Sequence, residues 1–314
     1  MDKIFQSLEL YLDDKIATQT EIDRFILFIQ KLKSSRRVRF IYRGDSNIIK
    51  QYKTDSSNLP LLAHYIFCLG DKGRFFFQNK LVNINSVFSL IWDKFHNKVC
   101  KLNFNSDSTM KCVSDFLNTN PMFNDYFSDE HNKEHFENFS QLSIDKANEV
   151  ADYYLAILHT IGISGNGNSY FLSSSTNYLV ADEFKGDNNI IIFGWLPKTG
   201  LQDCIIKYID VEKNSPFVKS LNLPTCQAPV YPKQREICIK CGLLPHYIIG
   251  FQHNNRFYIN PNTLKQWNDN IVYEGLEIDQ KTFNDLFNAT NLRQSFIFYD
   301  GNYYFMSKQG LAEV

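Results

Sequence analysis

Two stretches near the N-terminus carry apolar side chains at the spacing of amphipathic helices. In residues 3–13 they are Ile4, Phe5, Leu8 and Tyr11, and in residues 21–32 they are Ile22, Phe25, Ile26, Ile29 and Leu32. A period near 3.6 residues predicts one helix in each stretch, the second capped by Thr18 or Thr20. Residues 1–36 are therefore expected to form a helical segment packed on a core behind it.

A strand and a long helix are predicted in the next part of the chain. The apolar run from Val38 to Tyr42 reads as a short strand ending in a turn, and Ser143 to Leu158 has the spacing of a helix. Residues 103–142 between them are rich in Asn, Asp, Ser and His. We expect a single domain over 37–314 with a mostly helical, solvated insertion around 95–142.

The second half is richer in short apolar runs separated by turn residues. The predicted strands are Ile190 to Trp195, Cys204 to Tyr208, Glu236 to Cys241, Tyr247 to Phe251, Phe257 to Ile259 and Phe296 to Tyr299. Turns such as Asn254-Asn255 favour antiparallel connections. With helices expected around Asn262 to Trp267 and Gln280 to Phe287, the pattern predicts an α+β fold.

Composition and charge narrow the class of protein. A net charge of −1 over 314 residues argues against a protein that binds nucleic acid by bulk electrostatics. Seven cysteines without a secretory signal indicate a reducing compartment. Apolar runs such as Phe25 to Ile29 are far shorter than the ~20 residues of a membrane span. The protein is expected to be cytoplasmic, without a membrane partner.

Hydroxyl side chains gather where a strand is expected to pass into a helix. Tyr170 to Leu172 lead into three serines and a threonine, and a helical apolar pattern follows to Phe184. Hydroxyls at such a junction either cap the helix or bind a ligand. Both alternatives stay open.

Two further motifs stand beside apolar stretches. Arg43 leaves a strand next to Gly44, where its planar guanidinium can meet a phosphate, or it can form an ion pair with Asp45 or another acid. Gln234 lies two positions before Glu236, on the same side of a predicted strand. The plainer interpretation of Glu236 is a surface acid paired with Arg235 or Lys240.

In this order, the three motifs resemble the arginine-serine-glutamate branch of the ADP-ribosyltransferase superfamily. That branch has an early Arg, then Phe-x-Ser-Thr-Ser, then Glu-x-Glu or Gln-x-Glu, and Ser174 here replaces the usual Thr. The 130 positions from Arg43 to Ser173 require an insertion between them. The resemblance implies a split antiparallel β-sheet core.

The resemblance also implies roles in the cleavage of NAD. Glu236 would stabilise the oxocarbenium-like ribose, Gln234 would orient the acceptor, and Ser173 would bind the ribose and hold Glu236. Arg43 would bind the phosphates. The candidate NAD-binding residues are Arg43, Gly44, Ser173, Ser174, Ser175 and Tyr178. The proline-containing loop expected from Lys213 to Lys233 would contact the target through Phe217 and Tyr231.

No metal site is expected. The pair Cys238-x-x-Cys241 lacks the second pair that a structural zinc site needs, and residues three apart on a strand face opposite sides. His159, at the end of a predicted helix, fits a capping role better than the role of a base or ligand.

A second resemblance weakens the enzymatic interpretation. Tyr42-Arg43-Gly44, then Leu158 to Gly162, then Asn177 to Phe184 look like a diverged FRG domain, a family with little assigned chemistry. The leading hypothesis is a mono-ADP-ribosyltransferase that uses NAD to modify a protein or nucleic acid, acting as a bacterial toxin or antiphage effector with a possible neutralising antitoxin. The alternatives are a non-catalytic FRG-like binding module and an NAD glycohydrolase.

Overall fold

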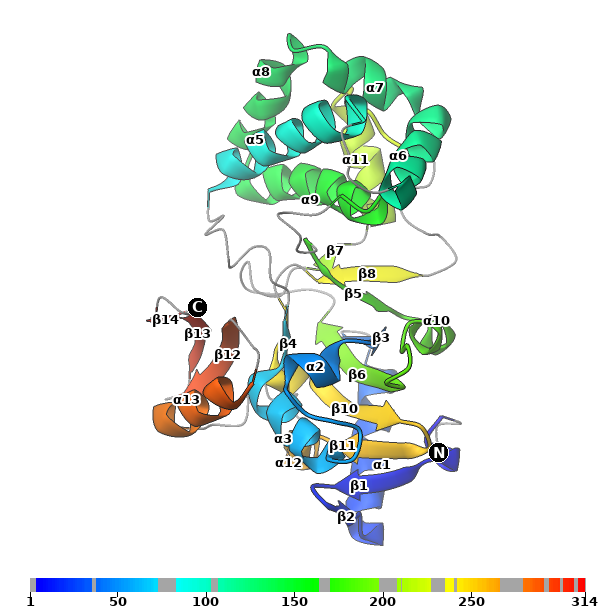
Figure 1. Ribbon diagram of the computed structural model, residues 1–314, viewed down its shortest axis with the longest axis vertical. Helices are drawn as coiled ribbons and strands as arrows, with labels where there is room; N and C mark the ends of the chain where they lie inside the picture. The colour runs from blue at the N-terminus through cyan, green and yellow to red at the C-terminus, as the bar shows by residue number, and fades with distance from the viewer. Residues whose placement is uncertain are drawn as a thin grey trace. The chain divides into compact units, whose positions relative to one another are not determined.

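The protein is described by a computed structural model in which the chain forms two compact units (Figure 1). The described residues are 4–35, 38–72, 83–102, 107–163, 170–197, 208–209, 211–226, 235–239, 242–265, 279–290, 294–299, 302–307 and 310–313. Unit 1 comprises Met1–Lys72, Ser173–Ile206 and Gly242–Val314, and unit 2 comprises Gly73–Leu172 and Lys207–Cys241. Helices and strands both contribute, which confirms the α+β class.

A mixed sheet forms the centre of unit 1. The first seven strands of this sheet, in spatial order, are β2 (Lys15–Ile16), β1 (Glu9–Leu12), β11 (Arg256–Ile259), β10 (Ile248–His253), β6 (Ile190–Pro197), β3 (Val38–Gly44) and β5 (Leu172–Ser175). β1 runs parallel to β11, whereas the other described pairs are antiparallel. The antiparallel preference expected from the turn residues is confirmed for β10 and β11, where Asn254 has a φ of 53°.

The helix expected over residues 3–13 is wrong. Phe5–Ser7 form a single 3-10 turn (η1), after which β1 and β2 make a hairpin with Asp13 at a φ of 55°. Leu10 is buried although it lies off the predicted helical face. Pairing with β11, more than 240 residues away in the sequence, overrides the local helical spacing.

The second N-terminal helix is confirmed as α1 (Gln19–Ser34). Thr18 and Glu21 form the capping box that satisfies the first backbone N–H groups. Phe25 from α1 contacts Phe5 and Phe257, and both of these rings contact Phe193. The contacting ring centroids in this aromatic cluster are 5.1–5.7 Å apart. This cluster fastens the N-terminal segment to the sheet.

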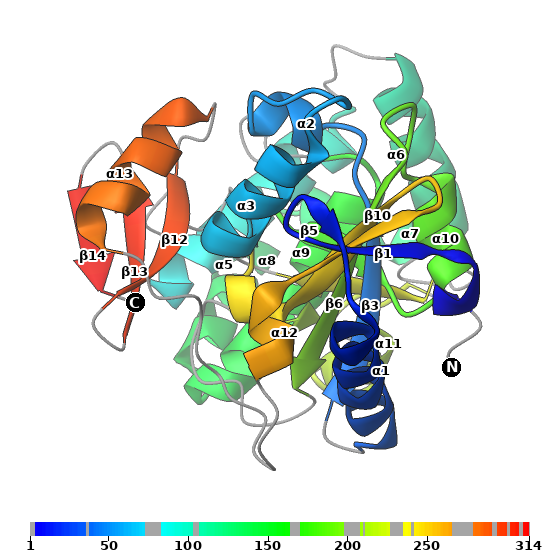
Figure 2. The same cartoon turned by 90° about the horizontal axis from the view of Figure 1, so that it is seen from below.

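Further helices and two small sheets complete unit 1 (Figure 2). The helices are α2 (Ile48–Gln51), α3 (Leu59–Leu69), α10 (Tyr178–Glu183), η4 (Pro245–Tyr247), α12 (Pro261–Lys265) and α13 (Gln280–Ala289). β4 (Asp71–Lys72) pairs with β9 (Gly242–Leu243), and β12 (Gln294–Tyr299), β13 (Asn302–Ser307) and β14 (Gly310–Glu313) form a meander. α1 packs against α12, and α3 packs against β10. The apolar run Phe75-Phe76-Phe77, which favours a strand, lies outside the described residues.

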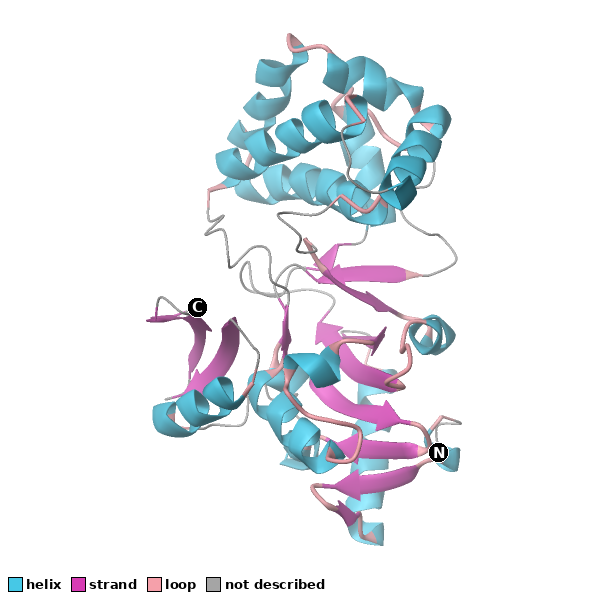
Figure 3. Ribbon diagram, in the orientation of Figure 1, coloured by secondary structure: helices cyan, strands magenta, loops and turns pink. Residues whose placement is uncertain are grey.

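Unit 2 is mostly helical (Figure 3). Its helices are α5 (Ile84–Lys94), the π-helix η2 (Phe95–Cys100), α6 (Asp107–Thr119), α7 (Pro121–Ser128), α8 (Asn132–Glu137), η3 (Asn138–Gln141), α9 (Ile144–Thr160) and α11 (Val211–Ser220). β7 (Tyr208–Ile209) pairs with β8 (Glu236–Ile239). The helix predicted from Ser143 is therefore confirmed, and described helices occupy most of the polar stretch 103–142.

The loop expected from Lys213 to Lys233 begins instead with a helix. α11 packs against α9, with Val218 buried and Phe217 partly buried against the core of unit 2. This packing explains why the segment is helical although Pro216 lies inside it. Tyr231, the other proposed target contact, lies outside the described residues.

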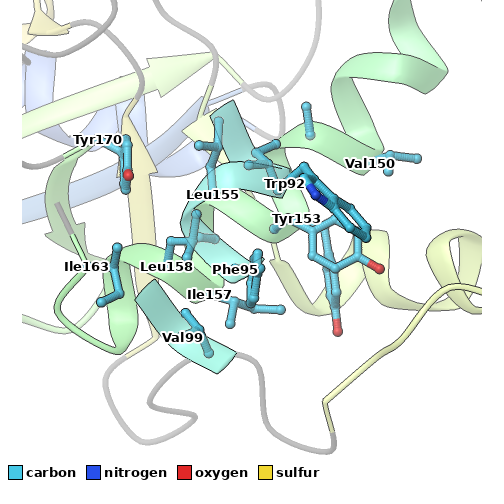
Figure 4. Packing of buried hydrophobic residues seen from close by; sticks show 14 of the residues in the cluster. Trp92, Phe95, Val99, Val150, Tyr153, Leu155, Ile157, Leu158, Ile163 and Tyr170 are labelled. Atoms are coloured by element: carbon cyan, nitrogen blue, oxygen red, sulfur yellow. The ribbon is translucent and has the colours of Figure 1, made fainter. Parts of the chain in front are cut away.

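Aromatic side chains dominate the core of unit 2, part of which is drawn in Figure 4. α9 is the central helix, buried at successive positions from Val150 to Leu158. The rings of Phe95 and Phe127 stack with centroids 4.5 Å apart, and Tyr154 meets Phe127 edge-on at 5.6 Å. Burial on this scale accounts for the cohesion of the helical unit. No helix in the described part of the chain is long and apolar enough to span a membrane.

A buried imidazole in unit 1 should make folding stability depend on pH. His246 in η4 is 2% exposed, and burial lowers its pKa from 6.5 to about 3. Between these values the unfolded chain binds a proton that the folded chain excludes. The stabilisation is therefore complete above about pH 6.5 and is lost as the pH falls, by up to about 1.4 kcal/mol per pH unit.

The measurement compares urea unfolding of the wild type and His246→Phe across this pH range. The packing cost of the substitution is independent of pH. The pH dependence of the difference between the two unfolding free energies therefore reports protonation of the His246 imidazole. We expect the wild type to lose stability faster than the variant on acidification. If the unfolding free energies of the wild type and His246→Phe changed in parallel with pH, His246 would not be a buried neutral imidazole.

Candidate functional site

The candidate residues fall in both units and are described unit by unit. Arg43, Gly44, the serine strand and Tyr178 lie in unit 1, whereas Glu236 lies in unit 2. Gln234 lies outside the described residues.

Arg43 is held by two acids and a backbone carbonyl. Its Nε donates to Asp71 Oδ2 at 2.9 Å, its Nη2 donates to Asp45 Oδ2 at 2.8 Å, and its Nη1 donates to the carbonyl oxygen of Ser173 at 2.8 Å. The Arg43 side chain is 19% exposed, against 4% for Asp45 and 2% for Asp71. The ion pair with Asp45, one of the alternatives weighed for Arg43, is therefore present, with Asp71 as a second partner.

The charges around Arg43 do not favour an additional anion. Burial acts to lower the pKa of Arg43, but the carboxylates of Asp45 and Asp71 outweigh it and raise the pKa. The one guanidinium is thus already shared between two acidic side chains. Tyr52 beside them donates to the carbonyl of Gly70, and its pKa is raised by burial and then by the two acids. A phosphate would meet repulsion here, so the geometry supports a role for Arg43 in fastening β5 to β3.

Gly44 is required by the close approach of α10 to β3. A Cβ added at Gly44 would lie 2.1 Å from the carbonyl oxygen of Ala181 and 2.6 Å from the backbone nitrogen of Lys185. Tyr42 and Tyr178 meet edge-on at 5.8 Å, and the Tyr178 hydroxyl donates to Gln252 at 3.1 Å. Tyr42-Arg43-Gly44 and the segment that begins at Asn177 therefore pack together, although they are far apart in the sequence.

The serine strand supplies the start of α10. Ser173 is partly buried, and Ser174 and Ser175 are buried. The Ser175 hydroxyl accepts a hydrogen bond from the Asn177 backbone N–H at 2.9 Å, and Asn177 caps α10 by accepting from the Leu179 N–H. Asn177 therefore caps α10, and Ser175, two residues earlier, binds the backbone N–H of Asn177.

Unit 2 brings Glu236 together with His159. Glu236 opens β8, and its Oε1 lies 3.4 Å from Nε2 of His159 in the last turn of α9, with side-chain exposures of 10% and 18%. The His159 ring meets Phe171 edge-on at 5.8 Å. The predicted alternative partner Lys240 lies outside the described residues. Glu236 is therefore a mostly enclosed carboxylate with an imidazole beside it.

Cys238 is the third member of this group. The ligand atoms of His159, Glu236 and Cys238 all lie within 4.8 Å of one another. The pKa of the Cys238 thiol is raised well above its usual value. Burial is the largest cause, and the charge and hydrogen bond of Glu236 and the charge of Asp152 raise the pKa further. In this environment the sulfur is a protonated thiol and a poor nucleophile. Sequence reasoning missed this group of three, although Glu236 and Cys238 are two residues apart on a strand and therefore lie on the same side of it.

A cavity of about 310 Å³ lies beside the π-helix of unit 2. Its lining is polar and carries both signs of charge: Ser89, Trp92, Asp93, His96, Asn97, Lys101, Glu130 and Lys133. His96 is fixed there by its Nδ1, 2.8 Å from the carbonyl of Phe127. Nothing in the sequence pattern indicated this cavity.

Comparisons with models of protein families, with curated proteins and with solved structures find no match to this chain.

Proposed function

We propose that the protein is an NAD-dependent mono-ADP-ribosyltransferase in which Glu236 stabilises the oxocarbenium-like ribose as nicotinamide leaves. The observation that carries this proposal is the enclosure of the Glu236 side chain, which is 10% exposed and has Nε2 of His159 3.4 Å from its Oε1. A carboxylate held in a mostly desolvated setting stabilises positive charge more strongly than one in water. Cleavage of a glycosidic bond needs such a group.

The contact between Arg43 and Ser173 supports the same proposal. It joins, by one hydrogen bond, two signature residues that are 130 positions apart in the sequence. Because Asp45 and Asp71 already bind the guanidinium, we assign Arg43 to positioning the serine strand rather than to holding the phosphates. Ser173 keeps the ribose-binding role that the resemblance implies.

The proposed acceptor is a macromolecule, either a protein or a nucleic acid. Gln234 orients it in this proposal, as the resemblance implies. The setting is the cytoplasm of a bacterium, where the enzyme acts as a toxin or antiphage effector and a neutralising partner restrains it. These assignments follow from the family resemblance.

The test uses NAD labelled in its adenine and a cell lysate that supplies acceptors. We expect the wild type to release nicotinamide and to label macromolecules, and Glu236→Gln to reduce both by on the order of 100-fold or more, because the charge is lost while the shape is kept. Glu134→Gln, an exposed acid in α8 of the same unit, is the matched control and should keep full activity. Equal nicotinamide release by the wild type and Glu236→Gln contradicts the proposal.

A non-catalytic FRG-like binding module is the second candidate. The observation that favours it is the structural use of the Tyr42-Arg43-Gly44 motif, in which Arg43 is bound by two acids and Gly44 lies against α10. Calorimetry with NAD separates the candidates. A non-catalytic module would bind NAD without releasing nicotinamide. An NAD glycohydrolase would release nicotinamide but leave the label in free ADP-ribose.

A further inference from the structure

We propose that His159, Glu236 and Cys238 of unit 2 form a binding site for a divalent transition metal, with Zn²⁺ as the best match. One nitrogen, one carboxylate oxygen and one sulfur meet with all three ligand atoms within 4.8 Å of one another. Zinc takes these three donor types in proteins, whereas Mg²⁺ and Ca²⁺ prefer oxygen alone. The site shares Glu236 with the proposed function, but the geometry that supports it does not depend on that function.

The separation of His159 and Glu236 fits a shared metal better than a direct hydrogen bond. Their atoms are 3.4 Å apart, beyond the usual 2.7–3.2 Å of an N–H to oxygen bond. Two ligands about 2.05 Å from a tetrahedral zinc ion are themselves about 3.4 Å apart. A sulfur at about 2.3 Å would stand about 3.6 Å from each of them. Because the ligand atoms lie within 4.8 Å of one another, a contraction of at most about 1.2 Å around Cys238 completes the geometry.

The three ligands stand on regular elements that limit their freedom. Glu236 and Cys238 are two residues apart on β8 and therefore point to the same side of the strand. His159 comes from the last turn of α9, the 17-residue central helix of unit 2. Ligands fixed by a strand and a packed helix lose little further freedom when an ion binds.

Burial and charge favour a cation at this point. Cys238 is buried, whereas His159 and Glu236 are partly exposed, so an ion can enter from the side of these two residues. The Glu236 carboxylate in this group supplies a negative charge that a divalent cation offsets. Three protein ligands leave a fourth position for water, as in catalytic zinc sites.

Both proposals use Glu236, so they predict competition for one carboxylate. Zinc bound at this site should suppress nicotinamide release. The test below measures binding by absorption and does not depend on activity, so failure of one proposal is distinguishable from failure of the other.

The test titrates the metal-free full chain with Co²⁺ under reducing conditions and records its absorption. We expect one equivalent of Co²⁺ to give a near-ultraviolet thiolate charge-transfer band and intense visible bands, both removed by Zn²⁺. Cys238→Ser should abolish the thiolate band, and His159→Gln should weaken binding at least about 10-fold. The matched controls are Cys112→Ser and His131→Gln, exposed residues of the same unit, which should bind like the wild type.

Circular dichroism of each metal-free variant checks its fold. His159→Gln is the second variant if Cys238→Ser does not fold, because His159 is partly exposed and its loss leaves the sulfur in place. The proposal is overturned if the wild type gives no stoichiometric thiolate band. It is equally overturned if a folded Cys238→Ser keeps that band or if His159→Gln binds as tightly as the wild type.

Discussion

Replacing Arg43 with alanine is expected to lower the free energy of unfolding by about 3–5 kcal/mol. The guanidinium is the described ion-pair partner of both Asp45 and Asp71, whose side chains are 4% and 2% exposed. Its removal takes away the guanidinium that these two buried acids share, and it breaks the hydrogen bond to Ser173. The cost arises from uncompensated buried charge rather than from lost contact area. Urea unfolding followed by circular dichroism measures it.

Two companion variants separate charge from geometry. Arg43→Lys keeps the positive charge but not the planar fork that meets three acceptors, so it should recover only part of the loss. The triple variant Arg43→Met, Asp45→Asn, Asp71→Asn replaces all three charged groups with neutral ones. This variant should therefore be more stable than Arg43→Ala. A loss below about 1 kcal/mol for Arg43→Ala would mean that water replaces the guanidinium, and the fastening role of Arg43 would then be wrong.

The result also bears on the proposed function. If Arg43 positions the serine strand, Arg43→Lys should impair stability and nicotinamide release together. If Arg43 holds the phosphates of NAD, the same variant should mainly raise the KM for NAD while stability stays near that of the wild type. Measuring both quantities on one variant decides between the two roles.

Local signals in the sequence predicted the elements whose stability is local. α1 carries its own start signal, the capping box of Thr18 and Glu21, and Asn254 allows the tight turn between β10 and β11. Residues 3–13 show the limit of such signals. Their apolar spacing suits a helix, but pairing between β1 and β11 decides the outcome, and that partner is invisible in an 11-residue window.

The candidate sites depend on contacts that no local pattern encodes. Asp71 lies 28 positions after Arg43 and follows an apolar helix, so nothing near Arg43 indicated this second acid. His159 and Glu236, which are far apart in the sequence, meet because the fold of unit 2 brings the last turn of α9 to the start of β8. The sequence showed which side chains had suitable chemistry, whereas their partners depend on how distant segments pack.

Phe127→Ala should destabilise unit 2 by about 3–5 kcal/mol, the usual cost of removing a fully buried phenyl ring. Phe127 in α7 is fully buried, and its ring stacks on Phe95 at 4.5 Å and lies 5.3 Å from both Trp92 and Phe136. Rings of this size cannot collapse into the vacated space without leaving their preferred rotamers, so a cavity remains. Thermal or urea unfolding followed by circular dichroism and tryptophan fluorescence measures the loss.

Met122→Ala is the matched control because Met122 lies in the same helix but is 49% exposed, so its truncation should cost no more than about 0.5 kcal/mol. Phe127→Leu keeps most of the apolar volume and should fall between the two variants. The ordering of the three variants is the informative result, since a helix that packs through this ring must respond to the volume removed. If Phe127→Ala and Met122→Ala had similar unfolding free energies, α7 would not be packed against Phe95 and Trp92 in solution.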